Sequence, residues 1–280
     1  MSSRYHALRV SAVVDETHDS KSLVFEVPQD LLDAFKYAPG QFLTLRLPIE
    51  GRHVPRCYSM SSTPAVDAAP RVTIKRVAQG RGSNWVCDTV KAGDVIEVMP
   101  PAGVFTPRAL QGNFLLLAGG SGITPVFSIL RAVLSQAQGR IVLLYANRDE
   151  QSVIFRDELK ALAAAHPTRL QVIHWLDSVQ GVPSVAQLAE LARTCPSDRQ
   201  LQAFICGPGP FMDAAVAALQ AIEMPSEQVH VERFASLPDE EAAAASAMAA
   251  RLEVPEGAVT EARMRIRLDG TEHELVCAGD

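Results

Sequence analysis

A glycine-rich turn between an apolar run and a proline constrains this chain more than any other stretch. The stretch reads Asn113-Phe-Leu-Leu-Leu-Ala-Gly-Gly-Ser-Gly-Ile-Thr-Pro125. Its apolar run has the length of a buried strand, and Gly119, Gly120 and Gly122 allow positive φ and close approach of a ligand. We expect Thr124 to cap the next helix and Pro125 to lie in its first turn. The bare amides of such a helix start suit a phosphate, although a tight turn without a ligand fits the same residues.

Length and charge limit the classes of protein that this chain can be. Its 280 residues predict two domains rather than one. Its net charge of −6 argues against nucleic acid as a partner, and any anion-binding site must therefore be locally basic. No apolar run approaches membrane-spanning length. The first residues lack an apolar signal core, which favours a cytoplasmic protein. The five cysteines include no C-x-x-C pair and the seven histidines are scattered, so we expect reduced thiols and no metal ligands.

Residues 1–110 have the pattern of a β-barrel. Alternating or β-branched runs occupy residues 8–14, 22–27, 41–47, 71–77 and 94–99, each bounded by turn residues. Together with the polar segment around residues 56–59, they predict a closed, six-stranded antiparallel barrel. One short helix is expected at residues 83–90.

The barrel carries two polar groups that suit an anionic, aromatic ligand. In Arg56-Cys-Tyr-Ser59, the arginine fork can hold a phosphate, the Tyr58 ring can stack, and the Ser59 hydroxyl can donate or accept. An ordinary edge strand with a solvated arginine is the alternative for this tetrapeptide. The second group is Lys75-Arg76-Val77 followed by Gly82-Ser83-Asn84, and the latter lies at a helix start that can bind a second phosphate oxygen.

Residues 111–236 change to alternating strands and helices. Strands are expected at residues 114–118, 141–145, 170–175, 204–206 and 229–231, and helices at residues 125–136, 155–165, 184–192 and 210–222. This order predicts a five-stranded parallel sheet with right-handed crossovers. Ligands of such sheets bind at the carboxyl ends of the strands.

Two further loops follow strands at that edge. Cys206-Gly207-Pro208 repeats the glycine turn before a helix, and Cys206 either faces the ligand crevice or is a small buried residue. The other loop carries Arg148, Asp149 and the neighbouring Glu150, charges that could be solvated loop residues without a ligand.

The three glycine- and arginine-containing motifs together resemble the ferredoxin–NADP⁺ reductase superfamily. The resemblance implies that the barrel binds FAD and the second domain binds the nicotinamide coenzyme. It also implies that the loop with Arg148, Asp149 and Glu150 lies near the adenosine end of that coenzyme. There Arg148 favours a 2′-phosphate, whereas Asp149 and Glu150 favour a free ribose, so we expect NADH, with NADPH as the alternative. It implies that Arg56 binds the FAD pyrophosphate, Tyr58 stacks on the isoalloxazine and Ser59 hydrogen-bonds near flavin N5. The remaining implied cofactor-binding residues are Lys75, Arg76, Val77, Gly82, Ser83, Asn84, Gly120, Gly122, Thr124, Pro125, Arg148, Asp149, Cys206, Gly207, Pro208, Glu232 and Phe234. Tyr58, Ser59 and Cys206 would border the hydride-transfer site, while a plain last strand is the alternative for the segment with Glu232 and Phe234.

The C-terminal residues resemble the opening of another domain. Residues 237–261 are rich in alanine and acidic residues and predict a linker, and residues 262–280 contain two alternating runs around Asp269-Gly270, a strong hairpin signal. This hairpin resembles the start of a [2Fe–2S] ferredoxin domain, for which the cysteine ligand pattern is missing. We therefore expect the natural protein to continue with a cluster domain. A short form that passes electrons to a separate carrier is the alternative.

This order of segments is similar to that of reductase components of bacterial oxygenases. Residues 145–149, 153–155, 174–181 and 206–212 look most similar to reductases of 3-ketosteroid 9α-hydroxylases, and those of phenylacetyl-CoA epoxidases are a weaker match. The resemblance implies an enzyme that takes hydride from NADH and passes single electrons to a Rieske-type oxygenase or a ferredoxin. A stand-alone flavin or ferredoxin reductase, and a non-enzymatic flavin-binding module, are the alternatives.

Overall fold

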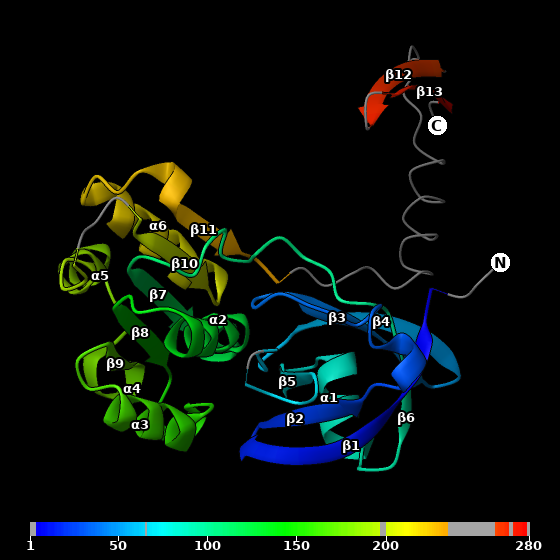
Figure 1. Cartoon of the computed structure of the whole chain (residues 1–280), viewed down its shortest axis with the longest axis horizontal. Coiled ribbons are helices and arrows are strands. Elements are labelled where there is room, and N and C mark those ends of the chain that lie inside the picture. The colour runs from blue at the N-terminus through cyan, green and yellow to red at the C-terminus, as the bar shows by residue number, and fades with distance from the viewer. Residues whose placement is uncertain (1–3, 65, 197–199, 235–260, 269–270, 279–280) are drawn as a thin grey trace. The chain divides into compact units, whose positions relative to one another are not determined.

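The computed structural model describes residues 4–64, 66–196, 200–234, 261–268 and 271–278, the last two ranges by their backbone only. The chain forms two compact units, Met1–Ser236 and Leu237–Asp280, which are described separately. The first unit contains a β-barrel lobe and an α/β lobe (Figure 1). No helix in the ranges described has both the length and the apolar character needed to cross a membrane.

The first lobe is a six-stranded antiparallel barrel. Its strands are β1 (His6–Thr17), β2 (Ser20–Glu26), β3 (Phe42–Ile49), β4 (Arg52–Ser59), β5 (Arg71–Lys75) and β6 (Val95–Val98). They are ordered β4-β3-β6-β1-β2-β5, and a bridge between Met60 and Val72 closes the barrel by joining the end of β4 to β5. The predicted barrel is confirmed. Helix α1 (Arg81–Thr89) begins two residues before its expected start.

Alternation along the strands builds the core of the barrel. Leu43, Leu45 and Leu47 in β3 are fully buried, and the residues between them lie on the opposite face. Burial of each leucine contributes about 1.5–3 kcal/mol. A slip of one residue would expose all three leucines, so the alternation strongly favours this register.

The second lobe is a five-stranded parallel sheet covered by helices on both faces. Its strands are β7 (Phe114–Gly119), β8 (Ile141–Asn147), β9 (Leu170–Leu176), β10 (Gln202–Cys206) and β11 (Val229–Glu232), in the order β11-β10-β7-β8-β9. Its helices are α2 (Ile123–Gln136), α3 (Arg156–Ala165), α4 (Asp177–Gln180), α5 (Val185–Ala192) and α6 (Gly209–Ala221). The predicted parallel sheet is confirmed, and α4 is an element that we did not predict.

The central strands are apolar on both faces because each face carries its own core. Leu116 packs into one buried cluster, and its neighbours Leu115 and Leu117 pack into the other. Strands buried on both sides read as continuous apolar runs rather than alternating ones. The run before the glycine turn is therefore explained by the sheet's position between two helical layers.

The start of α2 differs from our expectation. The helix begins at Ile123 with Gly122 as N-cap and without a side-chain cap hydrogen bond, so the predicted capping role of Thr124 is wrong. The reason is that Gly120–Gly122 already forms a turn of 3₁₀ helix, which starts the winding before Thr124 is reached. Pro125 lies in the first helical turn, as expected.

The second unit contains a two-stranded antiparallel hairpin. Strands β12 (Glu261–Leu268) and β13 (Thr271–Ala278) pair in register, with Leu268 opposite Thr271. The predicted hairpin is confirmed. Its Asp269-Gly270 turn and residues 237–260 of the expected linker lie outside the described residues.

Candidate flavin and nicotinamide site

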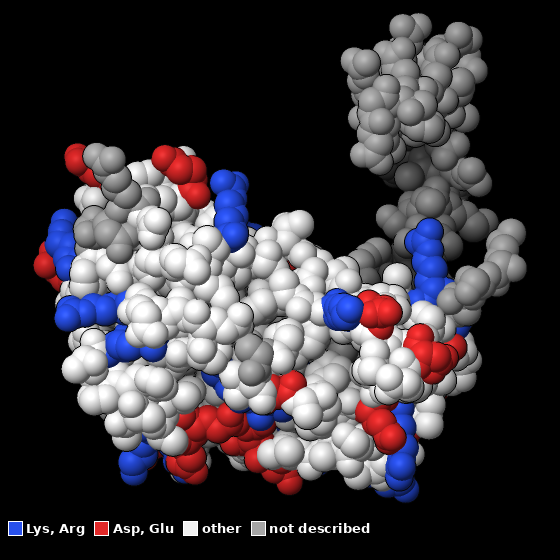
Figure 2. Space-filling model, viewed as in Figure 1, with Lys and Arg blue, Asp and Glu red and all other residues white. Residues whose placement is uncertain are grey.

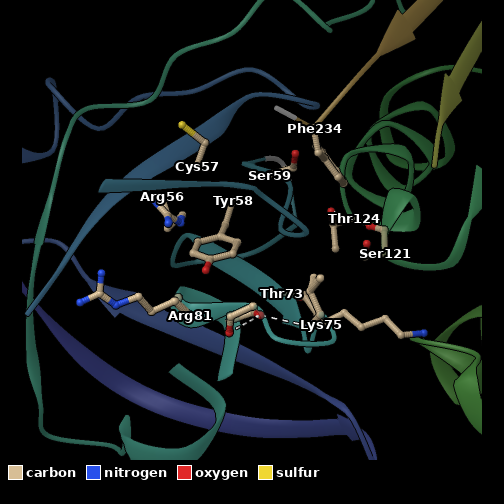
Figure 3. A pocket seen from close by; sticks show the side chains of 14 residues that line it. Arg56, Cys57, Tyr58, Ser59, Thr73, Lys75, Arg81, Ser121, Thr124 and Phe234 are labelled. Atoms are coloured by element: carbon tan, nitrogen blue, oxygen red, sulfur yellow. Dashed lines mark hydrogen bonds between the residues drawn. The ribbon is translucent and has the colours of Figure 1, made fainter. Parts of the chain in front are cut away.

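A cavity of about 270 Å³ opens between the barrel and the carboxyl edge of the parallel sheet. Its lining comes from β4, β5, the start of α1, the glycine turn and the segment after β11. Figure 3 shows Tyr58 at the centre, with Arg56 and Arg81 to one side and Thr124 and Phe234 to the other. The sequence-predicted residues that line the cavity are Arg56, Tyr58, Ser59, Lys75, Val77, Gly82, Ser83, Thr124 and Phe234. Both lobes therefore contribute predicted residues to one site.

The cavity is locally basic. Its lining includes Arg56, Lys75 and Arg81, and none of the described lining residues is acidic. Acidic and basic side chains both occur over the surface in Figure 2, and the whole chain has a net charge of −6. The cavity lining thus carries positive charge although the chain as a whole is negatively charged, as a site for a phosphate-containing ligand requires.

Arg56 lies over the start of α1. Its guanidinium donates to the carbonyl of Pro55 at 2.8 Å. A Cβ added to Gly82 would lie 3.0 Å from Arg56 Cγ, so glycine at this position leaves room for the arginine stem. The result is a guanidinium beside a helix N-terminus, two groups that bind phosphate oxygens.

Tyr58 carries a buried hydroxyl that forms no hydrogen bond with any described group. Its ring packs against the barrel core, and burial raises the pKa of the phenol far above its usual value. The phenol is therefore neutral at physiological pH. An unpaired buried hydroxyl costs about 1–3 kcal/mol, and a ligand with a polar atom beside the ring would supply the partner.

The first turn of α1 offers backbone amides rather than side chains. The helix begins after Gly80 with no side-chain cap. Ser83 Oγ accepts from the Val77 amide at 3.1 Å, and Asn84 Nδ2 donates to the Val77 carbonyl at 3.3 Å. Both side chains thus hold the preceding turn, and Asn84 lies outside the cavity lining.

Lys75 and Arg76 differ in their surroundings. Lys75 lines the cavity, with its ammonium 3.7 Å from Asp19. Arg76 instead pairs with Asp88 of α1 at 2.6 Å and is absent from the lining, because it lies on the other face of the strand end. Val77 lines the rim and is 61% exposed. This exposed apolar side chain suits contact with a flat ring.

The glycines of the turn are needed mainly for close packing and less for unusual backbone dihedral angles. Only Gly120 has a positive φ, of 52°. A Cβ at Gly122 would lie 2.1 Å from the Cys206 carbonyl oxygen, and one at Gly119 would lie 2.9 Å from Pro208 Cδ. Gly119 and Gly122 do not use the positive φ that glycine allows, since their φ values are −120° and −61°. The loops after β7 and β10 touch, and these two glycines permit that contact.

Cys206 and Glu232 occupy paired positions at the ends of β10 and β11. Cys206 is fully buried, and burial together with the nearby Glu232 raises the pKa of its thiol. Burial also raises the pKa of the half-buried Glu232 carboxyl. Cys206 is thus a neutral thiol, and neither residue is among the cavity lining.

The loop after β8 is held by local contacts. Asp149 accepts from the amide and hydroxyl of Ser152 at 2.9 and 2.8 Å, and from Arg148 Nε at 3.2 Å. These hydrogen bonds lower the pKa of the Asp149 carboxyl, the one from the Ser152 side chain most. Arg148 also lies 4.0 Å from Asp19. The predicted residues outside the cavity lining are Arg76, Asn84, Gly120, Gly122, Pro125, Arg148, Asp149, Cys206, Gly207, Pro208 and Glu232.

Several lining residues were missed from the sequence: Cys57, Thr73, Gly80, Arg81 and Ser121. Thr73 could have been found, because it precedes Lys75 by two residues on a strand and so shares its face. Thr73 Oγ1 is 2.7 Å from both Ser22 Oγ and Ser61 Oγ. Ser121 lies inside the glycine turn but its side chain carried no distinct signal.

Two family models match the chain in the order of its lobes. Residues 7–106 match the oxidoreductase FAD-binding domain and residues 116–217 match the oxidoreductase NAD-binding domain. The fold and the site thus define an FAD- and NAD-binding oxidoreductase. Among solved structures, the CS-b5R domains of a human protein in the NAD⁺ form have a TM-score of 0.72 and 25% identity, covering 82% of this chain and 69% of that one.

Similar curated proteins indicate the family to which the chain belongs within this class of oxidoreductases. A 3-ketosteroid-9-alpha-monooxygenase ferredoxin reductase component from Rhodococcus rhodochrous is 53% identical over 98% of this chain and 76% of its own length. A subunit of the 1,2-phenylacetyl-CoA epoxidase from Escherichia coli is 37% identical over 82% of this chain and 68% of its own length. The chain therefore belongs to the oxygenase reductase components of the ferredoxin–NADP⁺ reductase superfamily, in the family of the 3-ketosteroid-9-alpha-monooxygenase ferredoxin reductases.

Proposed function

We propose that this protein takes hydride from NADH onto FAD held in the cavity and passes single electrons to an oxygenase component. The observation that carries the proposal is the shared cavity, in which Tyr58 and Ser59 of the barrel face Thr124 of the α/β lobe. When bound, FAD accepts two electrons as hydride and releases them one at a time. The residues present suit it: the lining is basic, as its pyrophosphate requires, and the buried Tyr58 phenol, which has no hydrogen bond to a described residue, can meet one of its polar atoms.

Each side chain then has a defined task. We assign the flavin pyrophosphate to Arg56 and to the α1 amides at Gly82 and Ser83, and the ring to Tyr58 and Ser59. Hydride transfer requires the reacting atoms to lie roughly 3–3.5 Å apart. Gly122 and Cys206 would form the uncharged wall that keeps the nicotinamide slot flat, and transfer of hydride itself calls for no acid or base.

Phe234 and Glu232 are assigned to the rim of the same slot. Phe234 is 49% exposed and lines the cavity. An exposed aromatic ring at a ligand site can cover the flavin face until the coenzyme arrives. The half-buried Glu232 carboxyl lies opposite Cys206 across the strand pair and would border the nicotinamide.

The partner proposal follows from the relatives. One is the reductase component of a 3-ketosteroid-9-alpha-monooxygenase, and we propose the same kind of terminal oxygenase for this chain. A phenylacetyl-CoA epoxidase-type oxygenase is the second candidate. A [2Fe–2S] centre would receive the electrons, on a separate ferredoxin or in a domain that begins at the β12–β13 hairpin. The four cysteines among the described side chains form no disulfide with one another, which fits the reducing cytoplasm.

The coenzyme preference is better assigned to Asp177 than to Asp149. The Asp149 carboxylate already accepts hydrogen bonds from Ser152 and Arg148. Asp177, by contrast, begins α4 directly after β9, and its buried Oδ1 forms no hydrogen bond with a described residue. The end of β8 lies beside it, since Asn147 pairs with Leu176. An acceptor at this edge of the sheet suits a ribose hydroxyl and repels a 2′-phosphate.

Asp177→Ser should therefore shift the coenzyme preference. We expect the NADH-to-NADPH ratio of kcat/KM to fall by about tenfold or more, because one good hydrogen bond to a charged group is worth about 1.5–3 kcal/mol. Glu150→Ser in the neighbouring loop is the matched control and should leave the ratio within a factor of two or so. An unchanged ratio in Asp177→Ser would remove this assignment.

The proposal as a whole is tested by an anaerobic visible spectrum of the purified chain, before and after one equivalent of NADH. We expect a yellow flavin spectrum that bleaches. Bleaching by NADPH alone would reverse the coenzyme assignment. Loss of flavin on gel filtration would favour a reductase that releases reduced flavin, and a protein that stays colourless with added FAD would overturn the proposal.

A further inference from the structure

The two lobes meet at a buried polar seam next to the cavity. We define the seam as Ser62, Thr63 and Asp67, which follow β4, together with Ser128 and Arg131 of α2. Ser62, Thr63 and Ser128 are fully buried. Buried hydroxyls are costly unless each finds a partner, so their presence in place of apolar residues calls for an explanation.

The seam hydroxyls form a reciprocal pair of hydrogen bonds between the lobes. Thr63 Oγ1 donates to the Ser128 carbonyl at 2.6 Å, and Ser128 Oγ donates to the Ser62 carbonyl at 2.6 Å. Each lobe thus supplies one hydroxyl donor and one backbone acceptor. Hydrogen bonds depend steeply on distance and angle. Two of them in opposite directions define how α2 lies on the barrel far more narrowly than apolar contact could.

A partly buried ion pair extends the seam by one helical turn. Arg131 donates to Asp67 through both terminal nitrogens, at 2.5 and 3.0 Å. Asp67 Oδ2 also accepts from the Thr63 amide at 2.7 Å. The Arg131 guanidinium lies 5.5 Å from the centre of the Phe127 ring. The bidentate geometry limits rotation of the helix about the hydroxyl pair.

The seam connects directly to both walls of the cavity. Thr124, Ser128 and Arg131 are spaced four and three residues apart in α2 and so share one helix face. Thr124 lines the cavity. On the barrel side, Ser59 lines the cavity and Thr63 follows it by four residues. A shift at the seam would therefore move one cavity wall against the other.

We propose that Thr63 and Ser128 are positioning residues for hydride transfer, which set the distance between the flavin wall and the nicotinamide wall of the cavity. This inference rests on the proposed function. Its physical basis is the sensitivity of the reaction to geometry, since a displacement of about 1 Å can slow a positioned reaction about 100-fold. Neither residue is among the described cavity lining, so both act through Ser59 and Thr124.

The test compares Ser128→Ala and Thr63→Val with Ser135→Ala. Ser135 lies in the same helix, is exposed, and bonds only to the local Ala132 carbonyl among the described contacts. We expect flavin bleaching by NADH in a single turnover to slow by about tenfold or more in both seam variants, at unchanged flavin content. The deuterium isotope effect of 4-deuterated NADH should rise as hydride transfer becomes limiting. Thr63→Ser keeps the donor and should restore the rate.

A second measurement needs no cofactor. In the FAD-free chain, amide hydrogen exchange of residues 61–63 should speed by about fivefold to tenfold in Ser128→Ala relative to Ser135→Ala. Unchanged bleaching in both seam variants would overturn the inference, as would slower bleaching that merely follows loss of flavin with an unaltered isotope effect. Wild-type protein that NADH does not bleach would instead contradict the proposed function.

Discussion

Gly122→Ala should slow reduction of the bound flavin by NADH about 100-fold or more while leaving the flavin content unchanged. The alanine Cβ would lie 2.1 Å from the Cys206 carbonyl oxygen and 2.6 Å from the Gly207 nitrogen. Both are backbone atoms, which cannot rotate aside as the end of a side chain can. Either the glycine turn or the loop after β10 must therefore move. The nicotinamide wall moves with them, and hydride transfer does not tolerate displacements of about 1 Å.

The conformation of Gly122 makes this a test of contact alone. Its φ of −61° and ψ of −11° are helical values that alanine adopts readily, so backbone strain contributes nothing. The flavin should stay bound because Arg56 and Tyr58 lie on β4, in the other lobe. Stopped-flow bleaching and the flavin-to-protein ratio measure the two effects separately.

Gly209→Ala is the matched control in the opposing loop. Gly209 begins α6, and no atom of the described residues lies within 4 Å of an added Cβ. Alanine there should leave the bleaching rate unchanged and raise the free energy of unfolding by roughly 0.4–1 kcal/mol through the lower entropy of the unfolded chain. Similar rates in the two variants would show that the contact between the loops does not shape the nicotinamide slot.

Local patterns in the sequence were sufficient for the fold. Period-two alternation of apolar residues predicted strands such as β3, and apolar runs such as that of β7, alternating with helical stretches, predicted a parallel sheet. These features succeed because each depends on neighbours within a few residues. The same locality explains the error at Thr124: the sequence Gly-Gly-Ser-Gly does not indicate whether the turn winds as 3₁₀ helix before the α-helix begins.

Contacts between distant segments could not be predicted in the same way. The residues of the ion pair between Asp67 and Arg131 are 64 positions apart, and neither side chain stands out from other surface charges. Asp149 was singled out by its charge, although its carboxylate caps the turn at Ser152. Asp177 lies in the segment 174–181 that contributed to the family resemblance, but its assignment came only from a buried oxygen that forms no hydrogen bond with a described residue. The sequence shows which residues are charged, but the group that each charge contacts depends on how the chain packs.

The motifs nevertheless identified much of the cavity, because its walls come from short contiguous segments. Arg56, Tyr58 and Ser59 lie on one strand, and Gly82 and Ser83 lie in one helical turn. A site built in this way keeps a recognisable spacing. The seam that aligns the two walls has no such spacing, since it joins the segment after β4 to the middle of α2.

Tyr58→Phe should have opposite effects on the two states of the protein. The Tyr58 hydroxyl is buried and forms no hydrogen bond with a described group, so its removal should raise the free energy of unfolding of the FAD-free chain by about 1 kcal/mol. If the flavin supplies the missing partner, the same change should weaken FAD binding by about fivefold to tenfold. Tyr58→Ala also removes the ring and should weaken FAD binding further, by about 100-fold or more.

Tyr37→Phe is the control that separates a ligand contact from an internal one. Tyr37 is also a partly buried tyrosine packed against the barrel core, but its hydroxyl lies 2.6 Å from Ser62 Oγ. Its loss should lower the stability of the FAD-free chain by about 1 kcal/mol and leave FAD affinity unchanged. Chemical denaturation and fluorescence titration with FAD measure both quantities. A Tyr58→Phe chain that is less stable without FAD would place the partner of the hydroxyl within the protein, and the flavin contact assigned to it would then be wrong.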